Sequence, residues 1–592
     1  MSNATTTTKV INGPIPPNAA LNRRRAMQLA TAGTAGALLA QAPQPAQAKS
    51  PPPGPTTPPF MMPLPVYTAK LPVTSLSPTP TGAPDVANGE CGRPVQQRRS
   101  DWPPQKFYEM HVREGQHSFH PQLPTQTVWG YDGTYPGPTF VERYNTPIIV
   151  RIYNDLPANA VGFGSPEITT HLHNLHDGSE SDGFTGDYYS RTKYGPTMTA
   201  AGAYKDHHYP NCYAGYDDPR YHDTDGDPRE ALGTLWYHDH RIDFTGPNVY
   251  RGLSGFYLLF DEIDSGDEQD PNPKALRLPS GVGRYDIPLL FQDKQFDSGG
   301  YLAYDQFATK GILGNKFCVN GKIQPFFKVE RRKYRFRLLG GGPSRFYEFY
   351  LATAAGANES FTYIGNDGNL LPAPLSMSKI YLGVAERADI VIDFSKYPLG
   401  TKLYLLNRLI QTDGRGPEDA LVNTRDANGL LTTPGTPVMR FDIDSEASAP
   451  DLSRVPSSLR ELPPIDLSEV RQTRRFEFDK ENEVWTVNGK TFDVENAVAK
   501  PKRGTAEIWT LKGKGSWHHP VHIHFEEGRI LSRNGQPPPP HQAGRKDVYV
   551  LEPNEEVRVF LRFRDFTGKY MMHCHNLIHE DHAMMIRWDI VA

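Results

Sequence analysis

The amino-acid sequence predicts an all-β protein built from several sandwich or barrel domains. Short runs rich in Val, Ile, Tyr and Phe alternate with turn residues, and their apolar side chains follow the two-residue period of a strand. The 592 residues include 55 prolines and 52 glycines, which favours many turns over long helices. Because one hydrophobic core cannot serve a chain of this length, we expect roughly two to four domains.

The N-terminus has the features of an export signal. Three arginines at 23–25 precede a weakly apolar, Ala- and Gly-rich run that ends in the cleavage pattern Ala46-Gln47-Ala48. Paired arginines before a mild apolar segment predict the twin-arginine export machinery, so residues 1–48 are interpreted as a signal peptide cleaved near Ala48. The mature protein would then be periplasmic or secreted. A disordered basic tail is the alternative, and the run is too short and too weakly apolar for a membrane anchor.

The rest of the chain divides into a proline-rich arm and three strand-rich blocks. Residues 49–99 form the arm, which has little core of its own. Polar seams at 261–274 and 444–464 divide the remainder into three blocks. These are the first block (100–265), the middle block (275–445) and the third block (463–592). Strands are predicted within 146–154, 253–262, 333–339, 386–394, 555–565 and 585–591.

One segment and the cysteines are less clear. Residues 188–233, rich in Tyr, Asp and His, are predicted to be a long surface loop, and "DTDGD" (223–227) lacks the closing glutamate of a calcium loop. In an exported protein any two of Cys91, Cys212 and Cys318 could pair, and the sequence does not say which. The formal net charge of −4 indicates no role in binding nucleic acid. The oligomeric state is left open.

The histidines are unevenly distributed. None of the 20 lies between His240 and His518, so the middle block offers no imidazole. Three motifs share one spacing, "HLH" (171–173), "HDH" (238–240) and "HIH" (522–524), and "HCH" (573–575) repeats it around a cysteine. Residues i and i+2 of a strand face the same side, so four such pairs can present eight imidazoles. That is more than one tetrahedral zinc needs, and it predicts a cluster of metal ions between the first and third blocks.

The same alternation predicts a second metal site. If the histidines of "HCH" face one way, Cys574 faces the other, and His519 also points away from the "HIH" pair. His579 and Met584 follow at five-residue intervals. A thiolate, two imidazoles and a thioether are the ligands of a blue-copper centre. A structural zinc site is disfavoured because further cysteines are missing, and the other histidines are expected to be solvated or to support these motifs.

At this point the motifs resemble a known family. "THLHNLHDGSESDGF", "TLWYHDHR", "HHPVHIHFEE" and "HCHNLIHEDHAMM" are similar to the four copper signatures of three-domain multicopper oxidases. "NVYRGLSGFYLL" and "FCVNGKIQPFFKVERRKYRFRLL" resemble the bacterial branch that contains spore-coat laccase, bilirubin oxidase and phenoxazinone synthase. The resemblance spans roughly residues 100 to 592 and implies three cupredoxin-like Greek-key domains, the middle one without copper ligands.

The resemblance also implies roles for individual residues. It assigns a type 1 copper to His519, Cys574, His579 and axial Met584, a type 2 copper to His171 and His522, and a type 3 pair to His173, His238, His575 and to His240, His524, His573. Asp182 and Glu580 match acids that help deliver protons to oxygen. Asn174 stands where the family usually has glycine, and the family's middle-domain disulfide has no clear counterpart.

The implied function is an oxidase with four copper ions. It would couple one-electron oxidation of phenolic, aromatic-amine or bilirubin-like donors to four-electron reduction of O2 to water. Oxidation of Cu(I) or Mn(II) is the enzymatic alternative, although the sequence has no methionine-rich insert of the kind that would favour cuprous ion. A non-enzymatic periplasmic copper-binding protein is the alternative from another class; it would need neither the paired imidazoles nor the bridging cysteine.

Overall fold

The computed structural model describes residues 54–185, 198–418 and 434–592. The predicted signal peptide, residues 1–48, lies outside the described residues. The predicted fold class is confirmed, because strands dominate and each block forms its own pair of sheets. The domain limits within the seams stay a prediction. No helix among the described residues is both long enough and apolar enough to cross a membrane.

The three blocks repeat one strand arrangement. In each, the first strand pairs antiparallel with the strand of a following hairpin and parallel with a later strand: β1 with β2 and β4, β9 with β11 and β14, and β23 with β24 and β25. Side chains alternate as expected for sheets that face a core on one side. In β30, Val557, Val559 and Leu561 are buried in the core of the third block, whereas Arg558 between them is exposed.

The elements of the first block form two four-stranded sheets. One has the order β2-β1-β4-β6 (Gln126–Tyr131, Lys106–His117, Ile148–Asn154, Tyr204–Tyr209), and the other β3-β8-β7-β5 (Phe140–Arg143, Ser254–Phe260, Thr234–Asp239, Thr170–Leu172). Short helices are η1 (Val86–Asn88, in the arm), η2 (Pro219–Thr224), η3 (Pro228–Glu230) and α2 (Thr245–Arg251).

The middle block has the largest sheet. The first follows β12-β11-β9-β14-β20-β17-β18 (Lys322–Ile323, Lys316–Val319, Asp286–Phe296, Lys333–Gly340, Arg387–Asp393, Phe361–Asn366, Asn369–Met377), with β10 (Leu302–Ala303) on β9. The second follows β13-β22-β21-β15-β16 (Phe326–Glu330, Thr436–Ser445, Lys402–Asn407, Tyr347–Thr353, Asn358–Glu359), with β19 (Ile380–Leu382) on β15; η4 is Phe394–Lys396.

The third block ends the chain. One sheet follows β24-β23-β25-β30-β27-β28 (Val484–Val487, Val470–Glu481, Thr505–Gly513, Glu556–Phe563, Gly528–Arg533, Arg545–Lys546). The other follows β29-β26-β31-β32 (Val548–Leu551, His519–Ile523, Gly568–Cys574, Met585–Ile590). Its short helices are η5 (Leu467–Glu469), η6 (Pro540–Gln542) and α3 (Leu577–Asp581).

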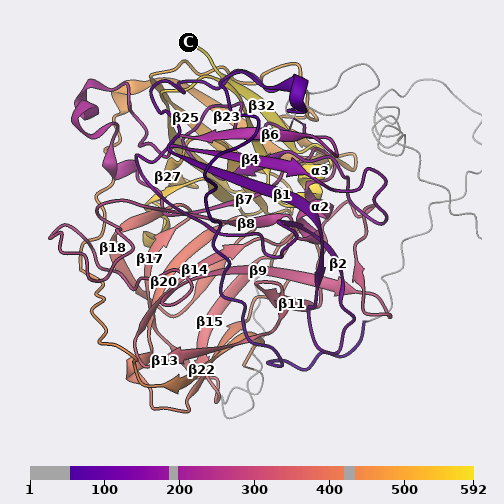
Figure 1. Ribbon diagram of the computed structural model, residues 1–592, viewed down its shortest axis with the longest axis vertical. Helices are drawn as coiled ribbons and strands as arrows, with labels where there is room; N and C mark the ends of the chain where they lie inside the picture. The colour runs from indigo at the N-terminus through magenta and orange to yellow at the C-terminus, as the bar shows by residue number, and fades with distance from the viewer. Residues whose placement is uncertain (1–53, 186–197, 419–433) are drawn as a thin grey trace, which may run out of the picture.

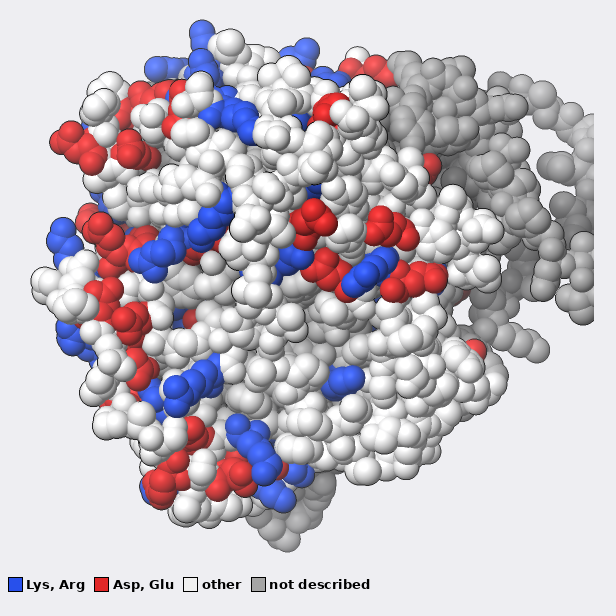
Figure 2. All heavy atoms as spheres, in the orientation of Figure 1, with Lys and Arg blue, Asp and Glu red and all other residues white. Residues whose placement is uncertain are grey.

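The first and third blocks lie side by side, with the middle block beneath them (Figure 1). Ring nitrogens of histidines from the first and third blocks approach one another to 3.2 Å (His171 and His522) and 3.1 Å (His240 and His573), which confirms that contact. On the face drawn in Figure 2, basic and acidic side chains are interspersed. Salt bridges of opposite charges, such as Arg440 with Asp442 at 2.6 Å, are consistent with the small net charge.

The proline-rich arm touches all three blocks. Its backbone N–H groups donate to the middle block at Phe326 (from Leu64, 2.7 Å) and to the first block at Phe107 (from Val73, 2.7 Å). Near its end the side chain of Gln97 donates to the carbonyl of Thr567 in the third block at 2.8 Å. The arm therefore follows the surface of the folded blocks.

Residues 188–197 of the predicted surface loop lie outside the described residues, and for the remainder, 198–233, the prediction is wrong in part. Residues Tyr204–Tyr209 form β6, a fully buried strand that pairs antiparallel with β4. The charged residues of this stretch suggested exposure. Asp206, however, is neutralised by Arg151, which donates to both of its carboxylate oxygens at 2.7 and 2.8 Å. A paired charge on a hydrogen-bonded strand can be buried, so composition alone misled the prediction.

The expected solvation of the remaining histidines is also wrong in several cases. His117 and His208 are buried, and each bonds a backbone carbonyl, of Gly321 at 2.6 Å and of Trp102 at 2.8 Å. All four cysteines are free and buried in the structure, so no pairing among the first three occurs in it.

Candidate metal centre

Four strands bring eight histidines together between the first and third blocks. In the first block, β5 and β7 pair so that His171 stands opposite His238, and in the third block, β26 and β31 pair so that His522 stands opposite His573. Directly opposed residues project from the same face of a sheet. The eight side chains are each 0% exposed: His171, His173, His238, His240, His522, His524, His573 and His575.

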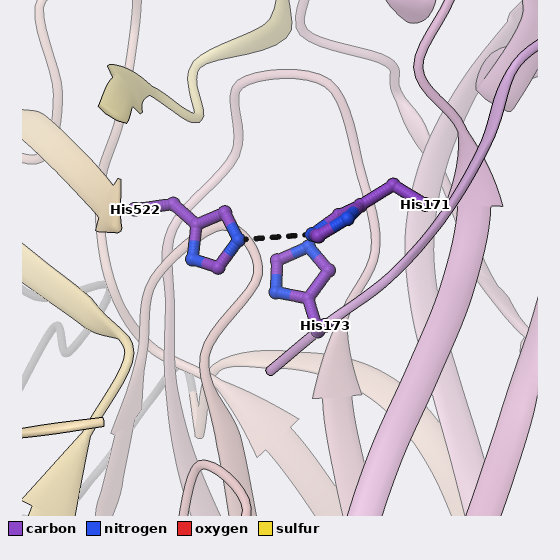
Figure 3. A group of neighbouring side chains, drawn as sticks. All are labelled: His171, His173 and His522. Carbon is purple, nitrogen blue, oxygen red and sulfur yellow. Dashed lines mark hydrogen bonds between the residues drawn. The ribbon is translucent and has the colours of Figure 1, made fainter. Parts of the chain in front are cut away.

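The rings meet through their Nε2 atoms. The Nε2 atoms of His171 and His522 are 3.2 Å apart, and Figure 3 shows His522 facing the two histidines of "HLH" across the block boundary. His173 approaches His575 at 3.2 Å in the same way. Ligand atoms lie within 4.8 Å of one another in three groups: His173, His238 and His575; His240, His524 and His573; and His171, His173 and His522.

The protonation of these rings fits a bound cation. Burial lowers the pKa of His240 and of His575 to about 3, so both rings are neutral near neutral pH. A neutral imidazole has one donor and one lone pair, and many of these lone pairs face each other instead of water. Buried polar atoms without partners are costly, whereas a metal ion satisfies several at once. Imidazole sets of this kind suit copper.

The two predicted acids lie at the Nδ1 side of these rings, away from the clustered Nε2 atoms. His171 Nδ1 donates to the backbone carbonyl of Asp182 at 2.5 Å, and His524 Nδ1 donates to its Oδ2 at 2.8 Å. Glu580, on α3, lies with Oε2 3.0 Å from His573 Nδ1. An acceptor at Nδ1 keeps the proton there and leaves the Nε2 lone pair for a metal.

A second group lies on the other side of β31. Cys574 Sγ is 3.6 Å from His519 Nδ1 and 3.4 Å from His579 Nδ1. The backbone N–H of Cys574 donates to the carbonyl of Met584 at 3.1 Å, and the Met584 side chain is buried. His573 and His575, the neighbours of Cys574, face the eight-histidine group instead, as strand alternation requires.

Burial also sets the protonation of the second group. Burial raises the pKa of the Cys574 thiol, and burial lowers the pKa of His519 to about 3. Without a cation this thiol stays protonated, and a metal ion would displace the proton. Two imidazoles with one thiolate are the strong ligands of a blue-copper site, so the residues fit copper.

Comparison with known proteins identifies the family. Residues 111–202 and 465–591 match two family models, each described as multicopper oxidase. The chain is 35% identical over 489 residues to a bilirubin oxidase from Albifimbria verrucaria, covering 81% of this chain and 75% of the relative. The chain belongs to the multicopper oxidase family. It is therefore an oxidoreductase that uses O2 as its electron acceptor.

Other relatives agree. A laccase from Bacillus subtilis is 30% identical over 551 residues, covering 84% of this chain and 96% of the relative. Among solved structures, a multicopper oxidase from Aquifex aeolicus is 26% identical with a TM-score of 0.65, covering 83% of this chain and 97% of that one. A multicopper oxidase from Pediococcus acidilactici shares the fold at 22% identity, with a TM-score of 0.69 and coverage of 91% and 93%.

Sequence reasoning missed two residues that contact this multicopper oxidase's metal centre. The indole of Trp485, on β24, stacks on the His579 ring with centroids 3.7 Å apart. Asp547, between β28 and β29, contacts His173. Neither residue belongs to a histidine motif. A lone acid just before the apolar run "VYVL" was the only local signal for Asp547, and Trp485 had none.

The departure at Asn174 has a simple backbone explanation. Asn174 has a φ of +52°, in the left-handed region that glycine adopts freely and asparagine tolerates best among other residues. The turn after "HLH" therefore keeps the geometry that a glycine would give. Its side chain is buried beside the site.

Proposed function

We propose that this multicopper oxidase takes single electrons from phenolic, aromatic-amine or bilirubin-like donors and uses four of them to reduce O2 to water. The names of its relatives, bilirubin oxidase and laccase, support that donor class. The observation that carries the proposal is the position of Cys574. Its sulfur faces His519 and His579, while the next residue on either side belongs to the eight-histidine group. One short stretch of backbone thus joins the two sites.

Four copper ions are the proposed cofactors. We assign type 1 copper to His519, Cys574, His579 and axial Met584, type 2 copper to His171 and His522, and the type 3 pair to His173, His238, His575 and to His240, His524, His573. Each type 3 set, and the His519, Cys574 and His579 set, has ligand atoms within 4.8 Å of one another, which supports the assignment. When bound, copper supplies one-electron redox chemistry and the site at which dioxygen is reduced.

The protein's own residues would orient the ligand rings, exclude water from the cluster and move protons. Complete burial of the eight imidazoles keeps bulk water from the cluster. The carboxylate of Asp182, bonded to His524 Nδ1, and that of Glu580, beside His573 Nδ1, are proposed to carry protons toward the reduced oxygen. Asp182 Oδ1 has no hydrogen-bond partner among the described residues, so it can take up a proton without losing a bond.

Electrons are proposed to enter at His579. Its Nε2 donates to the carbonyl of Lys310 at 2.9 Å, and Lys310 is an exposed residue of the middle block. The ring is therefore hydrogen-bonded directly to the backbone of an exposed residue. Trp517 lies edge-on to the same ring at 5.6 Å, with the exposed Arg415 over its indole.

We also propose export by the twin-arginine route, with cleavage near Ala48. The support is the sequence pattern of residues 1–48 alone. Expression with and without residues 1–48, followed by fractionation and N-terminal sequencing, tests this. Recovery of the full chain, uncleaved, in the cytoplasm would contradict it.

The function is tested with the copper-loaded protein. We expect about four copper ions per chain, a blue absorption band from thiolate-to-copper charge transfer, and O2 uptake with a donor. A panel of a phenol, bilirubin, Cu⁺ and Mn²⁺ separates the proposed donor class from metal-ion oxidation. Colourless copper-loaded protein that consumes no O2 with any donor would refute the proposal, and uptake with metal ions alone would replace its donor class.

A further inference from the structure

Asp547 touches two histidines of the metal centre at once. It lies between β28 and β29 and is 0% exposed. Its Oδ2 accepts from His173 Nδ1 at 3.0 Å, and its backbone carbonyl accepts from His522 Nδ1 at 3.0 Å. One ring nitrogen of each of these two histidines belongs to one group with a ring nitrogen of His171. One residue of the third block therefore orients a histidine of its own block and a histidine of the first.

The middle block holds Asp547 in place. Arg387, the first residue of β20, donates from Nη1 to both oxygens of Asp547, at 2.6 and 2.9 Å. Asp367 accepts the backbone N–H groups of Asp547 and of Val548, each at 3.2 Å, on its Oδ2. The other oxygen of Asp367 accepts the N–H of Arg387 at 3.2 Å. Asp547 is thus fixed through both its carboxylate and its backbone.

Arg387 also connects to β7, one of the two strands that bear ligands of the first block. Its Nε donates to the carbonyl of Thr234, at the start of β7, which ends beside His238. The side chains of Arg387 and Asp547 are both 0% exposed, so solvent does not weaken their pairing. The three blocks meet at these two side chains.

We propose that Arg387 and Asp547 are positioning residues for the copper cluster. Through them the middle block, which has no histidine, sets the tautomer and ring orientation of His173 and His522. The inference rests on the proposed function, because it supposes that those rings bind copper. Acceptors that orient ligand histidines typically strengthen metal binding by about 10- to 100-fold. The middle block would then be part of the metal site and not only a spacer between the other two.

The test compares two disruptive variants with a matched control. Arg387→Met removes the guanidinium. Asp547→Asn keeps the shape but replaces one of the two oxygens that accept from Arg387 by an amide nitrogen, so two donors face each other and the pairing is broken. Arg332→Met is the control, because Arg332 is a buried arginine of the same block that donates from one nitrogen to both oxygens of a carboxylate, Glu268, at 2.7 and 2.6 Å. Copper released to a chelator is counted over time, while electron paramagnetic resonance follows type 2 copper and the blue band follows type 1.

We expect the first two variants to bind cluster copper about 10- to 100-fold more weakly while the blue band persists. The type 2 signal should broaden or vanish, the control should behave as wild type, and Arg387→Lys should restore part of the affinity. Wild-type rates of cluster copper release in Arg387→Met and Asp547→Asn would overturn the proposal. Parallel loss of the blue band would do the same, since it would show a general structural role. If Arg387→Met does not fold, Asp547→Asn decides alone.

The proposed function can fail separately. Wild-type protein that takes up no copper would refute the oxidase assignment before any variant is compared. A fully loaded, active wild type together with unaffected variants would refute only the positioning role.

Discussion

Replacing Asp182 by asparagine should separate proton delivery from metal binding. Asparagine keeps the backbone carbonyl that accepts from His171 Nδ1 at 2.5 Å. Its amide oxygen can also take the place of the carboxylate oxygen that accepts from His524 Nδ1 at 2.8 Å. Both rings keep their orientation, so copper content and the blue band should not change. What is lost is a group that can release a proton next to the cluster.

The size of the effect follows from that loss. Positioned proton donors typically contribute about 10²- to 10⁴-fold to a rate, which corresponds to about 3 to 5 kcal/mol of activation free energy. Turnover at saturating donor should fall by that factor. The ratio kcat/KM for the donor should stay the same, because the donor is oxidised at the other copper site, so the KM for the donor falls together with kcat. The free energy of unfolding should fall by only about 1 kcal/mol, because a hydrogen bond to a charged carboxylate becomes a hydrogen bond to a neutral amide.

Oxygen uptake at saturating phenol, measured alongside copper content and absorption, checks this prediction. Asp286→Asn is a suitable control, since Asp286 is a buried acid of the middle block paired with Arg337 through two bonds of 2.8 Å. That variant should be less stable but turn over normally. Unchanged turnover in Asp182→Asn would refute the proton role, and a parallel loss of cluster copper would reassign Asp182 to holding the rings.

Three further outcomes are expected. Cys574→Ser should lose the blue band and all donor-driven O2 uptake while retaining cluster copper, seen by metal counting and the type 2 resonance; retention of the blue band would contradict the type 1 assignment. Trp485→Phe removes the indole N–H that donates to the carbonyl of Thr309 in the middle block at 2.8 Å, so denaturant titration should show a loss of about 1 to 3 kcal/mol, together with a shifted blue band because the ring on His579 changes; no change in either would show that the stack is incidental. Burial lowers the pKa of His117 from 6.5 to about 4, so the unfolded chain binds its proton first as pH falls. Stability should therefore drop between pH 6.5 and 4 by on the order of 3 kcal/mol from this group, and thermal unfolding of His117→Asn should show a flatter acid limb than wild type.

The sequence alone was enough to predict the fold class and the strand face on which each ligand side chain lies, because both depend on local periodicity. Side chains on a strand alternate strictly between its two faces. The spacing in "HCH" therefore places Cys574 on one face and both neighbouring histidines on the other, whatever surrounds the strand. The same rule separates His519 from the "HIH" pair. The strand runs at 333–339 and 386–394 correspond to β14 and β20 for the same reason. Which histidines would share an ion came only from the resemblance, and that assignment stays a prediction. It is supported by the ligand atoms of the two type 3 sets, which lie within 4.8 Å of one another in each set.

The tertiary structure decided which distant residues meet. No period in the chain relates Arg387 to Asp547, or Trp485 to His579, since their contacts arise where separate sheets pack against each other. The tertiary structure also decided which residues are buried. The polar sequence "YKDHHY" suggests that Asp206 is exposed, but Arg151 on the neighbouring strand neutralises its charge, so the strand can be buried. Local geometry sets the direction of a side chain, whereas its partner and its solvation depend on long-range packing between blocks that the order of residues does not express.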